Sequence, residues 1–88
     1  MVPRIAGAAD AVAERMAEAV RAALPGAVVE VTPRGPGHFE VSVVAEAFRG
    51  HSTLQQHQLV YAALAPLLAG EAAPVHAIDR LRTRAPER

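Results

Sequence analysis

The sequence contains no cysteine, no lysine and no tryptophan. Without cysteine the chain cannot form a disulfide, a thiolate zinc site or an iron–sulfur cluster of its own, and it has no thiol nucleophile. Any soft metal chemistry must therefore use its four histidines. Aromatic residues are almost as scarce, with two Phe and one Tyr. The core consequently has to be built mainly from Val, Leu and Ala.

An excess of charge of either sign is also missing. Nine acidic residues balance nine basic ones, whereas a protein that binds nucleic acid through its phosphates is expected to be basic. The basic residues are nevertheless unevenly placed, because four arginines lie in the last nine positions: Arg80, Arg82, Arg84 and Arg88. This tail favours an acidic partner.

Long apolar runs are absent as well. The longest, residues 59–70, is interrupted by Pro66 and is shorter than the roughly 20 residues that span a bilayer. The N-terminal residues include Arg4 and Asp10 and lack the apolar region of a secretory signal. We therefore expect a cytoplasmic protein with no membrane contact. At 88 residues we expect one domain across residues 1–88, with residues 1–3 and about 85–88 loose.

Two helices are predicted from the spacing of apolar residues. The first covers about residues 4–24, with Pro3 in its first turn and Leu24-Pro25-Gly26 ending it. The second follows Ser52, a suitable N-cap, and runs to Leu68. Pro66 lies inside the second pattern and should kink the helix or divide it into two pieces.

A β-hairpin is predicted between the helices. Residues 27–32 are largely β-branched, residues 33–37 form a proline- and glycine-rich turn, and residues 38–45 alternate in polarity. The apolar set in that alternation is Phe39, Val41, Val43 and Ala45. One buried face of a hairpin requires helices to cover it.

A closing strand is expected from Val75 to about Arg84, and it contains an irregularity. Ile78 and Leu81 are three positions apart, so strict alternation cannot place both on one face of a sheet. Either a one-residue bulge near Asp79 and Arg80 restores the register, or the strand stops at Ile78 and a loose basic tail follows. The pattern leaves both alternatives open.

Three segments of the chain resemble the BolA family. They are His-Phe-Glu-Val-Ser-Val-Val at 38–44, Phe-Arg-Gly at 48–50 with Leu-Gln-Gln-His-Gln-Leu-Val-Tyr at 54–61, and Val-His-Ala-Ile at 75–78. The resemblance covers nearly the whole chain, and the short turn at 33–37 is similar to the short-loop bacterial branch. It implies an α+β fold of the class II KH type, with order αββααβ and a three-stranded sheet whose helices pack on one face.

The resemblance also implies a function. BolA-like proteins partner monothiol glutaredoxins and share a [2Fe–2S] cluster with them and with glutathione, in cluster trafficking, iron or redox regulation, stress response and transcription regulation. The histidine of the Val-His-Ala motif is the family's ligand and corresponds to His76; His38 is the nearest candidate for a second ligand. The implied protein is not an enzyme, holds no cofactor when isolated, and can either form a homodimer or stay a monomer when alone.

Further residues are expected to contact the partner, and the chain departs from the family near some of them. Gln56-His57-Gln58 stands where the family usually has Arg-His-Arg, and Ala85 to Arg88 replaces an ending that contains tryptophan. His57 also fits a half-buried core position, and His51 is expected to be solvated in a turn. The expected partner-binding set is Phe48, Gly50, Gln56, His57, Arg80 and Arg82.

Other classes of function are less well supported. A KH-like nucleic-acid-binding regulator would use Arg49, Arg80, Arg82 and Arg84, but the sequence has no Gly-x-x-Gly loop. Catalysis is disfavoured because Ser42 lies on a strand, and Ser52 and Thr53 are typical capping residues with no paired histidine and carboxylate. The remaining alternative is a small scaffold whose histidines have no special role.

Overall fold

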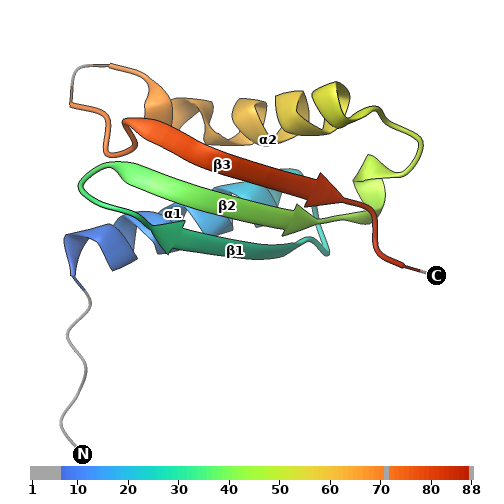
Figure 1. Ribbon diagram of the computed structural model, residues 1–88, viewed down its shortest axis with the longest axis horizontal. Coiled ribbons are helices and arrows are strands. Elements are labelled where there is room, and N and C mark those ends of the chain that lie inside the picture. The colour runs from blue at the N-terminus through green and yellow to red at the C-terminus, as the bar shows by residue number, and fades with distance from the viewer. Residues whose placement is uncertain (1–6, 71, 88) are drawn as a thin grey trace, which may run out of the picture.

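The computed structural model describes residues 7–70 and 72–87, which form two layers (Figure 1). The elements are α1 (Ala8–Ala23), β1 (Val28–Pro33), β2 (His38–Val44), a short 3-10 turn η1 (Glu46–Phe48), α2 (Thr53–Leu68) and β3 (Ala77–Arg84). The strands form one sheet in the order β1-β2-β3. β1 and β2 are antiparallel and β2 and β3 are parallel. Both helices cover one face, so the predicted α+β fold is confirmed; between β2 and β3 the chain forms the η1 turn and one α-helix in place of the two α-helices expected there.

Helix α1 presents its small apolar residues to the sheet. It buries one side through Ala13, Met16, Ala17 and Val20, which recur at helical spacing. It begins at Ala8 with Gly7 as its N-cap, so it starts later than predicted; positions 4–6 lie outside the described residues. After Ala23 the chain turns at Gly26, whose φ of 84° suits glycine.

Helix α2 has the predicted start and an uninterrupted course. The Ser52 side chain accepts a hydrogen bond from the Gln55 backbone, and the Gln55 side chain accepts one from the Ser52 backbone, which completes a capping box. The prediction that Pro66 divides this helix is wrong, because the helix continues to Leu68. Pro66 cannot donate the hydrogen bond to the Ala62 carbonyl, and this missing bond lies in the last turn, only two residues before the helix ends.

The bulge in β3 is confirmed, and the early end at Ile78 is excluded. Phe39 is opposite Ile78 and the next residue of β2 is opposite Arg80, so Asp79 is the extra residue. Beyond it Val41 pairs with Leu81, and the ladder continues to Arg84. The bulge therefore returns Ile78 and Leu81 to the same face.

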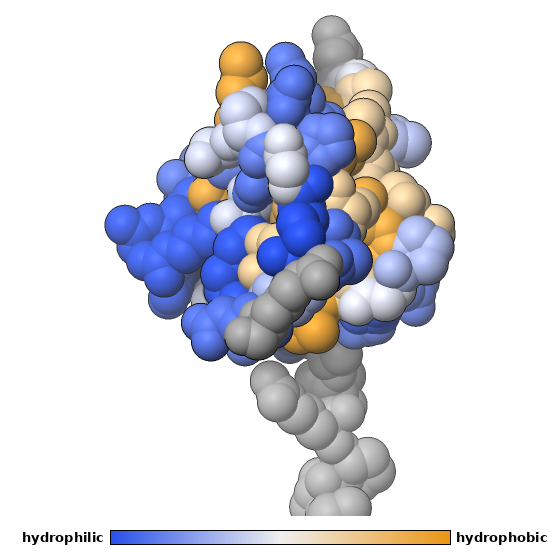
Figure 2. Space-filling view, turned by 90° about the vertical axis from the view of Figure 1, so that its right-hand side faces the viewer, coloured by the Kyte–Doolittle hydropathy of each residue, from blue (hydrophilic) through white to orange (hydrophobic). Residues whose placement is uncertain are grey.

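The core lies between the helices and one face of the sheet, and among the described residues it contains no polar or charged residue. Its largest fully buried side chains are Phe39, Phe48, Met16, Leu64, Val20, Val43, Val60 and Val75. Seen from the end that carries the C-terminus, hydrophilic side chains gather on the strand side and apolar ones on the helix side (Figure 2). Polar chemistry is therefore confined to the open sheet face, the loops and the outer surfaces of the helices.

Neither α1 nor α2 combines the length and the hydropathy that crossing a bilayer requires, within the part of the chain that the structure describes.

Candidate functional site

His76 lies on the surface, immediately before β3. Its backbone N–H donates to the Gly37 carbonyl at 2.8 Å, and the N–H of Ala77 donates to the same oxygen at 3.1 Å. The His76 side chain is exposed, and its ring makes no hydrogen bond with any described residue. Neither ring nitrogen therefore has a hydrogen-bond partner within the described residues, and two hydrogen bonds hold the backbone below the ring.

His38 begins β2 and lies close to His76 in the sheet. Its register partner on β3 is Ala77, the residue that follows His76. Its Nδ1 lies 2.9 Å from Oδ1 of Asp79, and both side chains are roughly half exposed, at 47% and 43%. A carboxylate that accepts from Nδ1 fixes the tautomer and leaves Nε2 to a ligand.

Asp79 belongs to this site, although no sequence pattern predicted a functional role for it. Its contact with His38 depends on the bulge, which inserts Asp79 as the extra residue of β3 beside the start of β2. The only sequence signal was the broken alternation between Ile78 and Leu81, which predicts a bulge but no contact. The bulge thus places the Asp79 carboxylate against a candidate ligand, His38.

The described residues do not form a complete metal site on their own. No group of three or more His, Cys, Asp or Glu side chains among them could hold a metal ion. His76 and His38 offer two imidazoles at one end of the β2–β3 pair. Such a donor set suits a metal group whose remaining ligands come from another molecule.

Several residues expected to bind a partner lie at the other end of the sheet. Phe48 and Gly50 follow the end of β2, and Gln56 lies in the first turns of α2 (Figure 1). Six residues of β2 follow His38 before this end, which is roughly 20 Å of strand. The expected partner-binding set therefore does not form one surface with His76.

The side chains at this far end have structural roles. Phe48 is 0% exposed, so its side chain belongs to the core and the expectation that it contacts a partner is wrong. Gln56 donates from Nε2 to the His51 carbonyl at 3.0 Å, and Gly50 occupies a turn with φ of 82°. His57 is half-buried, as predicted, and His51 is exposed, as predicted.

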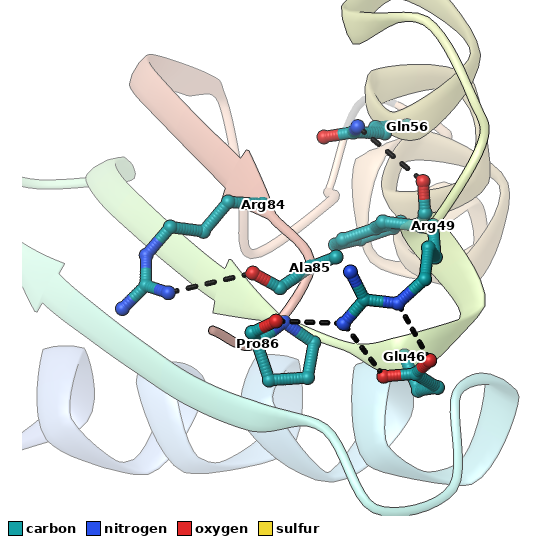
Figure 3. Close-up of polar contacts among 7 residues, drawn as sticks. Glu46, Arg49, Gln56, Arg84, Ala85 and Pro86 are labelled. Atoms are coloured by element: carbon teal, nitrogen blue, oxygen red, sulfur yellow. Dashed lines mark hydrogen bonds and ion pairs between the residues drawn. The ribbon is translucent and has the colours of Figure 1, made fainter. Parts of the chain in front are cut away.

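Arg49 joins η1 to the segment after β3 (Figure 3). Its guanidinium donates to both Glu46 carboxylate oxygens, at 2.7 and 3.1 Å, and to the Pro86 carbonyl at 2.7 Å. The hydrogen bonds to Glu46 raise the pKa of Arg49 above its ordinary value. The Arg49 guanidinium is therefore already engaged in hydrogen bonds with Glu46 and Pro86. The expectation that residues 85–88 are loose stays a prediction, because residue 88 lies outside the described part.

Arg80, Arg82 and Arg84 form a basic row along β3 on the open face of the sheet. All three are exposed, and Arg80 and Arg82 make no ion pair with any described residue. A hollow of about 260 Å³ beside them also contains Glu30, Ser42 and the Arg34–Glu40 ion pair. The face as a whole carries both signs of charge, whereas the outward side chains of β3 beyond the bulge at Asp79 are basic.

A comparison with protein families decides what kind of domain this is. The model of the family described as "BolA-like protein" matches residues 10–88. The chain belongs to the BolA family. The BolA segment thus includes both histidines, the bulge and all three strands.

BolA proteins of known sequence and structure support this assignment. BolA-like protein 1 of Homo sapiens and of Bos taurus are each 52% identical to the chain over 48 residues, which is 54% of this chain. The match spans only 33% of those relatives' own length. The solution structure of BolA1 from Mus musculus has a TM-score of 0.70 and 34% identity, covering 98% of this chain and 76% of that one. The BolA domain of SufE1 from Arabidopsis thaliana has a TM-score of 0.74 and 25% identity, covering 93% and 96%.

Proposed function

We propose that this BolA-family chain is a non-enzymatic partner of a monothiol glutaredoxin and supplies imidazole ligation to a [2Fe–2S] cluster shared with that partner and glutathione. The observation that carries the proposal is the state of His76, which is exposed, without a hydrogen-bond partner in the described part, and held by two backbone hydrogen bonds below the ring. The role would be cluster trafficking or iron and redox regulation. Cytoplasmic location belongs to the same proposal.

The donor chemistry of the chain supports a shared cluster. Thiolates normally hold [2Fe–2S] clusters, and histidine replaces them in centres of higher potential. This chain has no cysteine, so the thiolates must come from the partner and from glutathione. When bound, the cluster supplies the redox chemistry and is itself the group that is transferred, whereas His76 supplies one nitrogen ligand.

His38 is the candidate for a second ligand. Its bond to Asp79 is the carboxylate–histidine arrangement that commonly orients ligating imidazoles. This arrangement holds Nδ1 and presents Nε2, provided that the proton lies on Nδ1. The same contact equally serves as a surface ion pair of small energetic value, so His38 ranks below His76.

Binding of nucleic acid has less support. Of the four arginines that it would use, Arg49 already donates to Glu46 and Pro86. The basic row on β3 faces a sheet surface that also contains Glu30 and Glu40. A phosphate backbone would meet both signs of charge there.

The test is reconstitution without oxygen from the chain, a monothiol glutaredoxin, glutathione, iron and sulfide. We expect a heterodimer whose visible circular dichroism differs from that of the glutaredoxin homodimer. His76→Ala should abolish the difference, because the nitrogen ligand is gone.

The control for that experiment is His51→Ala. His51 is also exposed, but it lies at the other end of the sheet beside Gln55. Its loss should leave the mixed spectrum unchanged. A mixture that keeps the homodimer spectrum, or a His76→Ala protein that behaves like the parent, contradicts the proposed function.

A further inference from the structure

Gly37 and His76 approach each other more closely than any other residue would permit. Gly37 ends the turn before β2 and has φ of 75°. A Cβ built on it would lie 2.6 Å from both Cγ and Nδ1 of the His76 ring and 3.1 Å from its Cβ. Real Cβ atoms essentially never come within 3.0 Å of such neighbours. The absence of a side chain at position 37 therefore makes room for the ring.

We propose that Gly37 positions the imidazole of His76, with the Cγ–Nδ1 edge against the turn and Nε2 left as the nitrogen that meets an incoming metal ion. The ligand role of the ring rests on the proposed function. The packing of the ring on Gly37 does not, since it is a property of the isolated chain. Gly37 is thus a positioning residue and not itself a ligand.

Hydrogen bonds of the surrounding backbone limit how far Gly37 and His76 can move apart. The Gly37 carbonyl accepts from the backbone N–H groups of His76 and Ala77. The next pair along, His38 and Ala77, is held in the β2–β3 ladder. A side chain at position 37 can therefore be accommodated only by rotating the ring or by breaking these hydrogen bonds. Either response moves Nε2 away from its present position.

Gly35 provides a matched control in the same turn. It has φ of 118°, so a substitution there is also strained, but a Cβ on Gly35 would meet no atom within 4 Å. Asparagine tolerates positive φ better than most residues. Gly37→Asn therefore crowds the ring with little backbone strain, whereas Gly35→Ala imposes strain without crowding. The two variants separate the two effects.

The first experiment uses the isolated chain and NMR. In the parent we expect contacts between the Gly37 Hα protons and the His76 ring. Addition of Zn²⁺ as a probe should move the His76 Nε2 resonance to the range of a coordinated nitrogen and the Nδ1 resonance to that of a protonated ring nitrogen, because coordination through Nε2 leaves the proton on Nδ1. Gly37→Asn should alter the ring resonances and the Zn²⁺ response. Gly35→Ala, confirmed as folded by the same spectra, should preserve both. Coordination through Nδ1, or an unaltered ring in Gly37→Asn, overturns the inference.

The second experiment repeats the cluster reconstitution with the same variants. The Gly37→Asn protein should need a concentration about tenfold or more above that of the parent to produce the mixed spectrum, because changes that disturb ligand orientation commonly lower metal affinity by that factor. Gly35→Ala should match the parent. A normal titration with Gly37→Asn refutes the positioning role and leaves the proposed function intact. Absence of the mixed spectrum in every protein, with the NMR result as expected, refutes the proposed function alone.

Discussion

At the scale of single residues, the two histidines at the start of β2 and β3 differ in how they are held. His38 has one nitrogen engaged by Asp79, at 2.9 Å, and this contact orients its ring. The His76 ring packs against the Gly37 backbone and has no hydrogen-bond partner among the described residues. Neither nitrogen of the His76 ring has to give up a hydrogen bond with a described residue when it binds a metal ion, whereas in His38 only Nε2 is available. This difference is the physical reason for ranking His76 first.

Thr83 is a residue whose replacement should increase stability. It lies opposite Val43 on the helix-facing side of β3, and its Oγ1 is buried without a hydrogen-bond partner in the described part. Thr83→Val keeps the branched shape and removes the unsatisfied hydroxyl. The free energy of unfolding should rise by about 1 kcal/mol in urea denaturation.

Thr32→Val is the control for the Thr83 prediction. Thr32 also lies on a strand, but it is exposed, so the same chemical change should alter stability by less than about 0.5 kcal/mol. Equal effects of the two substitutions would mean that strand propensity, and not the buried hydroxyl, is responsible.

At the scale of elements, the bulge in β3 determines which residues face the core. Deleting Asp79 should leave a regular strand in which Ile78 and Leu81 still face inward and Arg80 outward. We expect the deletion protein to unfold cooperatively in urea, with a free energy of unfolding within about 1 kcal/mol of the parent. It should also free the His38 ring, visible as a changed His38 resonance.

Deleting Arg82 is the matched test of register. This deletion turns Thr83 outward and Arg84 toward the core beside Val43. A buried and unpaired arginine is costly, so stability should fall by more than about 2 kcal/mol. If both deletions prove equally harmful, the bulge has a role that the alternation of side chains does not explain.

Elements were more predictable from the sequence than contacts between them. Alternation in residues 38–45 and the Ser52 capping signal are local, and they identified β2 and the start of α2 correctly. The broken alternation at Ile78 and Leu81 was enough to propose the bulge. Local signals could not reveal that Phe48 is wholly buried, because a phenylalanine in a Phe-x-Gly turn fits a binding surface as well as a core.

The candidate site was predictable only in part, for a related reason. His76 and His38 were recognised through motif resemblance, and the structure brings their backbones together. The approach of Gly37 to the His76 ring, and of Asp79 to His38, depends on the parallel register of β2 with β3. Side chains that are about 40 positions apart meet through that register, which no short pattern encodes.

At the scale of the whole molecule, zero net charge conceals a separation of charge. Helix α1 carries three acidic and two basic side chains, of which Glu14 and Arg21 form an ion pair, whereas β3 presents its arginines at 80, 82 and 84 on the open sheet face. Such a distribution produces a field that orients an approaching partner even when the total charge is zero. Under the proposed function, the basic row would steer an acidic surface of the glutaredoxin toward the open sheet face along β3, the strand that begins directly after His76.

Arg82→Glu tests this steering, with Arg15→Glu as a control of equal charge change on α1. Both side chains are exposed, so neither substitution should alter stability by more than about 0.5 kcal/mol. Arg82→Glu should slow association with the glutaredoxin several-fold at low ionic strength in stopped-flow measurements, and the deficit should shrink as salt screens the field over about 10 Å at 0.1 M. Arg15→Glu should have a much smaller effect, because its charge lies away from the basic row. If the two variants slow association equally, only the total charge matters and β3 does not steer the partner. If neither variant slows association, the rate depends on the surface around His76 and not on the arginines of β3.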